Sequence, residues 1–451
     1  MQHWIAKMKL KKISITLALI TAVILIIWGW SYQISTTIKA SLAWEIYDNS
    51  LYLSGLLSIA LMSVTMMLAT RPVWLEKPFN GLDQIYRLHK WAGILAVMFA
   101  LSHWLIEMGD DLVKALFGRA GRLPEQDFSG FTHMMRDAAE GVGEWGVYLL
   151  FAMLILTLWK RFPYNLWHYV HRAMPLIYLS LAFHAVWLAP LVWWQQPVGW
   201  LMGILLVGGS FASLLSIKGL IGKSRRVQGS ITSISTSAMG ITEVKCQLER
   251  TWTGHRAGQF AFVTFEPSEG AHPFTIASAD HGNGQISFQI KGLGDYTRQL
   301  GYRLTIGHPV TVEGPYGQFN FKQRRHNAAQ VWIAGGVGVT PFLAWLEALQ
   351  NQPENSLEAE MHYSTHDRAT DPFIERLQEA CNHLNGIKLQ IHDSSQGRKL
   401  TAEQLLTLHP KEKAMEVWFC GPSSWGNALE KELREKSQGV LWFQQEAFEL
   451  R

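Results

Sequence analysis

Six long apolar stretches fill the first half of the 451-residue chain, whereas the second half alternates short apolar runs with polar turns. Each stretch approaches or exceeds the length that a helix needs to cross a bilayer. The pattern therefore predicts six transmembrane helices followed by a soluble region. The helices are expected at residues 13–30, 51–69, 81–109, 142–159, 166–188 and 198–217.

Lysine and arginine are distributed unequally between the two sides of these predicted helices. Fifteen lie on the side of the N-terminus and five on the opposite side, where residues 107–144 form the longest loop. By the positive-inside rule, both termini and the soluble region are expected in the cytoplasm. A cleaved signal peptide is an alternative for residues 13–30, but the run is long for one and no small-residue cleavage site follows.

The second half of the chain changes its pattern once. Residues 228–236, 258–265, 285–291 and 309–313 are rich in β-formers between Gly and Pro breaks, which predicts a small antiparallel barrel. From about residue 329, strands and helices alternate, which predicts a parallel sheet. The predicted domains are residues 1–222, 223–325 and 326–451. Three cysteines, all in the second half, argue against a disulfide framework and fit a reducing compartment.

Two histidines occupy the third predicted helix. His89 and His103 are fourteen residues apart, so they return to within about 40° of one direction on a helix. Imidazole is a common axial ligand of haem iron. A lone histidine on an apolar helix is more often a hydrogen-bonded packing residue, so this pair alone leaves both interpretations open.

The fifth predicted helix supplies a second pair. His171 and His184 are thirteen residues apart, which leaves about 140° between them on a straight helix. Pro175 between them could bend the helix. By depth, His89 matches His171 and His103 matches His184, which predicts two stacked haem sites with two histidines each. His168, one turn from His171, is an alternative ligand for the inner site.

Two motifs in the predicted barrel could hold a cofactor. The first is an extended segment with an aromatic ring and hydroxyl groups, formed by His272, Pro273, Phe274, Thr275, Ile276, Ala277 and Ser278. The second is a Gly-rich turn whose amides and Thr297 hydroxyl could contact phosphate; it comprises Lys291, Gly292, Leu293, Gly294, Asp295, Tyr296 and Thr297. Alone, such a turn is more often only a turn.

A third motif joins a buried strand to a helix. The Gly-rich turn ends at Pro341, which suits the first position of a helix, and a helix N-terminus can bind pyrophosphate. The spacing differs from the usual G-x-G-x-x-G. Its glycines and hydroxyl are Gly335, Gly336, Gly338 and Thr340. Farther on, Cys420, Gly421 and Pro422 end another strand in a tight turn, where Cys420 alone would be interpreted as a small buried residue.

Together with EGPYG (residues 313–317) and the terminal EAFELR, these motifs resemble the ferredoxin–NADP reductase superfamily. The six apolar stretches with their histidine pairs resemble the ferric reductase transmembrane domain. The combination resembles a bacterial member of the ferric reductase/NADPH oxidase family. It implies a six-helix transmembrane haem-binding bundle, then a cytoplasmic antiparallel β-barrel FAD domain and an α/β Rossmann-like NAD(P)-binding domain.

The resemblance also implies roles for single residues. His272, Pro273, Phe274 and Thr275, with Ser278 close behind, would hold the flavin. Lys291, Gly292, Gly294 and Thr297 would lie near the FAD pyrophosphate. The motif from Gly335 to Pro341 would bind the nicotinamide dinucleotide, and Cys420, Gly421 and Pro422 would lie beside the nicotinamide. Phe448 would stack on the flavin and move for hydride transfer.

The cofactor preference depends on the end of the second strand of the nucleotide domain. Ser364 and Arg368 suit a 2′-phosphate, whereas Asp367 suits a free 2′-hydroxyl. NADPH is the expected donor, with NADH possible.

The implied function is electron transfer from cytoplasmic NADPH through FAD and two b-type haems to an acceptor outside. The acceptor would be an Fe(III) chelate, for which Glu107, Asp110 and Asp111 are candidate gathering residues, or dioxygen, as in a superoxide-producing NADPH oxidase. Such carboxylates are more often only part of a hydrated loop, so they do not discriminate between the two acceptors. A further alternative is an electron-transfer subunit that feeds a periplasmic partner protein or quinone. The expected location is the bacterial inner membrane, in contact with the lipid bilayer and without a nucleic-acid partner. The sequence contains no EF-hand loop and no Pro-rich tail, so neither calcium regulation nor SH3-type regulation is indicated.

Overall fold

The computed structural model describes residues 3–35, 40–79, 81–122, 127–159, 162, 164–351, 357–409 and 414–446. The chain divides into two compact units. The helical unit consists of Met8–Pro72 and Gln84–Ile221. The two-sheet unit consists of Gly222–Arg451 together with Met1–Lys7 and the short segment Val73–Asp83.

Five helices in the described part of the chain are long and apolar enough to cross a membrane. They correspond to the first, second, third, fourth and sixth predicted spans. These are Lys12–Ile34 within α1 (His3–Ile34), α2 (Leu42–Ala69), α4 (Leu82–Met108), α6 (Gly130–Leu158) and α9 (Pro197–Ile217). The short elements between them are η1 (Val73–Leu75), α3 (Glu76–Phe79), α5 (Asp110–Phe117) and η2 (Leu191–Gln195).

The range predicted as the fifth span is not one helix. It is divided into α7 (Tyr164–His171) and α8 (Met174–Leu188), with Pro175 in the first turn of α8. Proline has no N–H to donate to the preceding turn, so a helix begins more easily at this position than it continues through it. The fourth helix also differs from the prediction, because α6 begins at Gly130, inside the predicted loop 107–144. Its first turns are too polar for an apolar window to detect.

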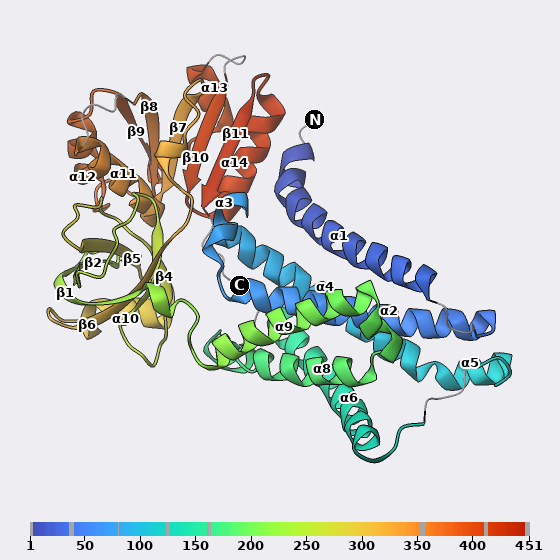
Figure 1. Ribbon diagram of the computed structural model, residues 1–451. Helices are drawn as coiled ribbons and strands as arrows, with labels where there is room; N and C mark the ends of the chain where they lie inside the picture. The colour runs from blue at the N-terminus through green and yellow to red at the C-terminus, as the bar shows by residue number, and fades with distance from the viewer. Residues whose placement is uncertain are drawn as a thin grey trace. The chain divides into compact units, whose positions relative to one another are not determined.

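Side chains of α1, α2, α4, α6, α8 and α9 share the core of the helical unit. Figure 1 shows the course of these helices. The hydroxyl of Tyr178 on α8 lies 2.9 Å from the Ser63 hydroxyl of α2 and donates to the Leu206 carbonyl of α9 at 3.4 Å. A Cβ at Gly209 of α9 would collide with the Tyr178 ring hydroxyl. Glycine at this position therefore lets three helices meet at one buried, hydrogen-bonded tyrosine.

The two-sheet unit begins with η3 (Lys223–Arg225) and a nearly closed antiparallel barrel, as predicted. The strands run in the order β4-β3-β6-β1-β2-β5, and a bridge from Ile276 to Phe288 approaches closure between the two edges. They are β1 (Arg226–Thr236), β2 (Ile241–Leu248), β3 (Phe260–Thr264), β4 (His272–Thr275), β5 (Gln285–Lys291) and β6 (Pro309–Tyr316). The helix α10 (Asp295–Arg303) follows β5 and η4 (Phe321–Gln323) follows β6.

The second sheet is parallel throughout, again as predicted, and its strand order is β11-β10-β7-β8-β9. The strands are β7 (Ala329–Gly335), β8 (Ala359–Thr365), β9 (Ile387–Asp393), β10 (Met415–Cys420) and β11 (Leu441–Glu446). Its helical elements are η5 (Gly336–Val339), α11 (Thr340–Gln350), α12 (Ile374–Asn382), η6 (Ser394–Gln396), α13 (Ala402–Leu408) and α14 (Ser423–Lys436).

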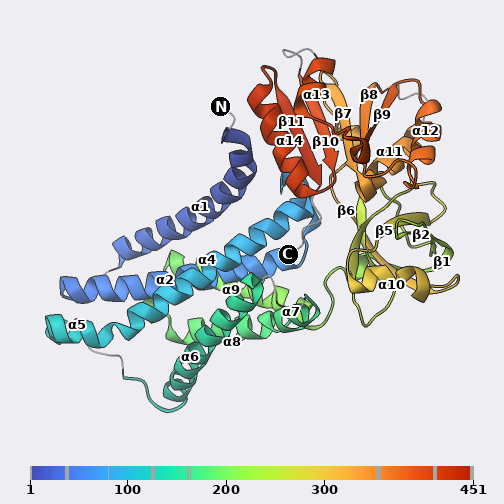
Figure 2. The same ribbon diagram turned by 180° about the vertical axis from the view of Figure 1, so that it is seen from behind.

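Alternation along the strands divides the parallel sheet into two faces. Trp332 of β7 and Trp418 of β10 belong to the apolar cluster with α11 and α12, whereas Val331 and Val417 belong to the cluster with α13 and α14. Figures 1 and 2 show these helices beside the sheet. Successive strand residues point to opposite faces, so a continuous apolar strand fills both layers. Because β7 and β10 are parallel neighbours, their carboxyl ends meet at one edge of the sheet, where ligands bind in such sheets.

Three histidines and a glutamate form a cluster on β8, β9 and the residue that follows α13, in which His362 and His409 are buried and Glu360 and His392 are half-buried. His362 is fully buried; its Nδ1 lies 3.1 Å from His392 Nε2 and its Nε2 lies 3.8 Å from Glu360 Oε2. His409 Nε2 lies 3.2 Å from the same Glu360 oxygen. Burial, together with the neighbouring His392 and His409, lowers the pKa of His362 to about 3.

This cluster predicts a loss of stability in acid. Between pH 6.5 and about 3 the unfolded chain binds a proton at residue 362 that the folded chain excludes. The free energy of unfolding therefore falls, by about 1.4 kcal/mol per pH unit for one such group. Urea unfolding of the purified protein, followed by tryptophan fluorescence, should show a smaller pH slope in His362→Gln. The control His366→Gln changes an exposed imidazole and should keep the wild-type slope; an equal slope in all three proteins would contradict the prediction.

Candidate functional site

The four predicted haem ligands of the helical unit lie in two pairs. The ring centroids of His89 and His171 are 6.2 Å apart, with 72° between the planes. Those of His103 and His184 are also 6.2 Å apart, with 85° between the planes. The division between α7 and α8 removes the 140° mismatch of a straight helix, because His171 ends one helix and His184 belongs to the next.

Main-chain carbonyls orient three of these imidazoles. Nδ1 of His89 donates to the Thr65 carbonyl at 3.0 Å and Nδ1 of His103 donates to the Leu51 carbonyl at 2.9 Å, both on α2. Nδ1 of His184 donates to the Ala139 carbonyl of α6 at 2.8 Å. A carbonyl can only accept, so each Nδ1 carries the hydrogen and each Nε2 keeps a lone pair. This is the arrangement found around metal-ligating histidines.

Two glycines give the imidazoles room. A Cβ at Gly55 would lie 3.1 Å from Cε1 and Nδ1 of His103, and one at Gly143 would collide with the ring of His184. A third imidazole, that of His171, is stacked on the Trp167 ring, with centroids 4.9 Å apart. The helices therefore approach each ring closely enough to fix its direction.

The spacing of the pairs fits an iron between two imidazoles. With metal–nitrogen bonds of about 2 Å and a nitrogen about 1 Å from its ring centre, the two centroids would lie about 6 Å apart. No group of three or more His, Cys, Asp or Glu among the described residues could hold a metal ion. A haem site needs only two such ligands from the protein, since the porphyrin supplies the others.

In the barrel, the first predicted flavin motif forms edge strand β4. The ring of His272 stacks on Tyr296 with centroids 4.9 Å apart and lies 6.3 Å from Phe274. Burial raises the pKa of Tyr296 to about 12. Thr275 is buried, and the Ser278 hydroxyl accepts a hydrogen bond from the Ser287 amide at 3.2 Å. The motif is thus an aromatic surface on an edge strand, next to the start of α10.

The Gly-rich turn after Lys291 does not present all the groups predicted for phosphate. The Thr297 hydroxyl accepts hydrogen bonds from the Leu293 and Gly294 amides, both at 3.0 Å. These three groups satisfy one another and cap α10, so here Thr297 organises the turn. The Gly292 backbone lies against Arg298, where a Cβ would be 3.2 Å from its Cα.

The two predicted nucleotide motifs touch at the edge of the parallel sheet. A Cβ at Gly338 would collide with the Cys420 carbonyl, and one at Gly421 would lie 3.3 Å from the Gly335 nitrogen. Gly336 has φ of +55°, a conformation that glycine adopts without strain. The Thr340 hydroxyl donates to the Val337 carbonyl at 2.6 Å, and Pro341 lies in the first turn of α11.

The turn at Cys420 and Pro422 places a thiol beside a carboxyl group. Cys420 and Glu446 are partners across β10 and β11. Burial raises the pKa of both groups, and Glu446 raises that of Cys420 further. One buried oxygen of Glu446, Oε2, has no hydrogen-bond partner in the structure. Phe448 lies outside the described residues, so its predicted role stays a prediction.

A second buried carboxylate reaches the barrel from the segment Val73–Asp83. Glu76 of α3 is 2% exposed, and its Oε2 accepts a hydrogen bond from the Gly317 amide at 3.2 Å. Burial raises the pKa of Glu76. Its partner Gly317 ends the EGPYG motif, whose Glu313 is paired with Arg226 at 2.9 Å. This short segment is therefore part of the two-sheet unit, although its neighbours in sequence are apolar helices.

The residues predicted to choose between NADPH and NADH lie at the end of β8. Ser364 is on the strand, and the Arg368 amide donates to Asp393 Oδ2 at 3.3 Å. Asp367 accepts hydrogen bonds from the Ala369 amide at 3.0 Å and the Thr370 hydroxyl at 2.9 Å. Its carboxylate therefore caps its own turn, which lowers its capacity to bind a ribose.

Sequence reasoning missed Glu76 and Glu446 as site residues. Glu76 lies in a loop that was noted for its basic residues, and Glu446 lies in a terminal motif that was noted for Phe448. Glu446 follows two glutamines at the end of β11, so the pattern of the strand does not single it out. Nothing in the sequence connects Glu76 with Gly317, which is 241 positions later.

Two family models match the chain in separate parts. Residues 54–182 match the ferric reductase like transmembrane component, and residues 227–320 match an FAD-binding domain. These matches confirm the resemblance to the ferric reductase/NADPH oxidase family. The helical unit and the barrel define the class: a membrane protein with a transmembrane ferric reductase-like part and an FAD-binding part, that is, an NAD(P)H-dependent oxidoreductase.

Three curated relatives are similar to parts of this chain. The propane 2-monooxygenase reductase component of Mycolicibacterium smegmatis is 25% identical over 37% of this chain and 51% of its own length. Ferric reduction oxidase 4 of Arabidopsis thaliana is 35% identical over 19% of this chain and 12% of its own. Dual oxidase 2 of Rattus norvegicus is 27% identical over 40% and 11%. The chain thus spans about half the length, or less, of these relatives.

Close contact at Gly338 predicts that alanine is not tolerated there. The added methyl group would push the loop away from the Cys420 carbonyl, at a cost of about 1–3 kcal/mol in stability. We expect the KM for NADPH in ferricyanide reduction to rise about tenfold or more. Gly141→Ala on α6 is the control, because nothing lies within 4 Å of its Cβ position. An unchanged KM in Gly338→Ala would show that the two motifs need not touch.

Proposed function

We propose that this protein carries electrons across a membrane, from cytoplasmic NADPH through FAD and two b-type haems to an acceptor on the far side. The two imidazole pairs are the observation on which the proposal rests. When bound, FAD would accept two electrons and release them singly, and the haems would relay them across the bilayer. His89 and His171 would hold the inner haem, and His103 and His184 the outer one.

The chain's own residues prepare these sites. The carbonyls of α2 fix the tautomers of His89 and His103, and the carbonyl of Ala139 fixes that of His184. Each Nε2 is thereby left as a ligand, and no side chain need act as acid, base or nucleophile. Two imidazoles from the protein would hold the haem at each site, and the haems would supply electron transfer to an acceptor that need not bind the metal.

The haem sites have a spectroscopic test. A reduced-minus-oxidised spectrum of the purified protein should show b-type haem, and His103→Ala should remove about half of it. His133→Ala changes an exposed histidine of α6 that is paired with Asp137 and should keep the full content. A haem-free protein that still transfers electrons across vesicles would contradict the proposal.

The topology proposed here has six membrane passes, with α7 and α8 together forming the fifth. The break between them is compatible with a pass because α8 continues as an apolar helix that is buried at Tyr178 and Ala182. The excess of basic residues on one side supports cytoplasmic termini, in a bacterial inner membrane. The proposed domains are residues 1–222, 223–325 and 326–451.

NADPH is the proposed donor rather than NADH. The Asp367 carboxylate is engaged in its own turn, whereas the side chains of Ser364 and Arg368 would suit a 2′-phosphate. Phe448 is proposed to cover the flavin until NADPH arrives, and Cys420 to border the nicotinamide. His272, Pro273, Phe274 and Thr275 would hold the flavin ring.

For the acceptor, we favour Fe(III) chelates. The acidic residues of α5 do not support this choice, because Asp110 and Asp111 form ion pairs with Lys114 on the same helix. The support is the ferric reductase-like match over residues 54–182. The similarity to dual oxidase 2 supports dioxygen as a second candidate.

The acceptor can be assigned with purified protein and either NADPH or NADH. Iron-chelate reduction is measured anaerobically, and superoxide is measured in air with superoxide dismutase as control. We expect iron reduction, faster with NADPH, and little superoxide. Superoxide as the main product would assign the oxidase function instead, and a faster reaction with NADH would overturn the choice of donor.

A further inference from the structure

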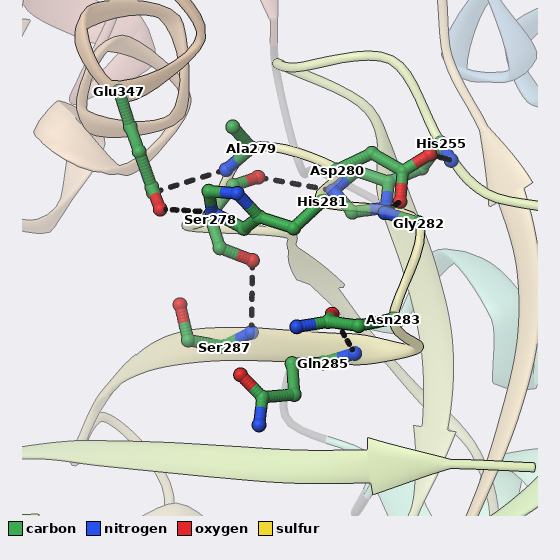
Figure 3. Close-up of polar contacts among 10 residues, drawn as sticks. All are labelled: His255, Ser278, Ala279, Asp280, His281, Gly282, Asn283, Gln285, Ser287 and Glu347. Atoms are coloured by element: carbon green, nitrogen blue, oxygen red, sulfur yellow. Dashed lines mark hydrogen bonds and ion pairs between the residues drawn. The ribbon is translucent and has the colours of Figure 1, made fainter. Parts of the chain in front are cut away.

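One polar side chain joins the helix of the nucleotide motif to the barrel segment of the flavin motif. Glu347 lies on α11, two turns after the Gly-rich loop. Its Oε2 accepts a hydrogen bond from the Ala279 amide at 3.0 Å, and its Oε1 lies 2.7 Å from Nε2 of His281. Figure 3 shows the carboxylate facing both groups.

The barrel end of this link is held rigidly. Ala279 directly follows Ser278, the last residue of the flavin motif, and is 2% exposed. The Ser278 carbonyl accepts a hydrogen bond from Nε2 of the buried His255 at 3.0 Å, and its hydroxyl accepts from the Ser287 amide (Figure 3). Asp280 accepts from the His255 amide at 3.3 Å and the Gly282 amide at 3.1 Å. Ser278 and Asp280, on either side of Ala279, are therefore both hydrogen-bonded to other residues of the barrel.

The helix end is equally fixed. Two residues before Glu347, Trp345 is fully buried and its Nε1 donates to the Ala257 carbonyl of the barrel at 3.1 Å. The Trp345 ring stacks on Phe319, with centroids 4.9 Å apart. Trp345 is a core residue whose loss would leave a cavity. The Glu347 side chain is 31% exposed, so its removal would cost a link without opening the core.

We infer that Glu347 is a positioning residue for hydride transfer: it holds α11, and with it the nicotinamide-dinucleotide loop, in register with the flavin motif at Ser278. The inference rests on the proposed function. Hydride transfer depends steeply on the separation and alignment of the donor and acceptor rings, and a misplacement of about 1 Å can cost about a hundredfold in rate. The Glu347 carboxylate does not contact the residues of either cofactor motif. It acts through its hydrogen bond with the Ala279 amide, which directly follows the flavin motif.

The test uses the full-length protein with its flavin and measures anaerobic flavin reduction by NADPH in a stopped-flow instrument. In Glu347→Ala, the limiting rate at saturating NADPH should fall about tenfold or more. The NADPH concentration at half-saturation, the bound flavin and the thermal midpoint should change little. The long-wavelength absorbance of the nicotinamide–flavin complex should weaken in parallel, since it reports ring stacking.

Glu347→Gln keeps an oxygen that can accept from the Ala279 amide, so it should recover most of the rate. The control Glu379→Gln removes an exposed carboxylate from α12 and should match the wild type. A wild-type rate and wild-type absorbance in Glu347→Ala would overturn the inference. So would an equal loss in Glu379→Gln, which would indicate a general charge effect. Failure of NADPH to reduce the wild-type flavin would instead refute the proposed function.

Discussion

Hydrogen bonds from imidazole nitrogens to main-chain carbonyls are the constraint on which the helical unit depends. An apolar bundle offers few partners to a polar ring, so a histidine there adopts the orientation that its nearest acceptor dictates. The acceptors for His89 and His103 are on α2, which is also the most deeply buried of the apolar helices. The same helix therefore forms the core and fixes which nitrogen of each ring stays available.

Much of this could be predicted from the sequence, because it follows from periodicity. The pairing of His89 with His171 and of His103 with His184 follows from depth along apolar helices, and the barrel and parallel sheet follow from strand patterns. The remaining elements could not be predicted because the same residue type can serve two different local structures. A proline that begins a new helix and one that bends an old helix look alike in sequence, so the division between α7 and α8 was not foreseen. The strand β2 lies outside the four β-rich segments that were named from the sequence.

Contacts between distant segments were the least predictable part of the site. Motifs identify Gly338 and Cys420 as nucleotide-binding residues, but only the folded sheet shows that one packs on the backbone of the other. Glu76 and Glu347 carry no motif of their own, and each matters through a partner brought near by the fold. To predict such residues, one must know which loops lie next to one another in the folded protein. The spacing of residues along the chain does not contain this information.

The two carbonyls of α2 that bind imidazoles have a further consequence for how the chain can vary. Leu51 and Thr65 are fourteen residues apart on α2, and His103 and His89 are fourteen apart on α4, so both antiparallel helices measure about 21 Å between the same two levels. The two helices therefore set the same spacing between the two histidine sites. One residue inserted within this interval of either helix would turn its far half by about 100°. Loops outside the interval can lengthen without changing the spacing of the two sites.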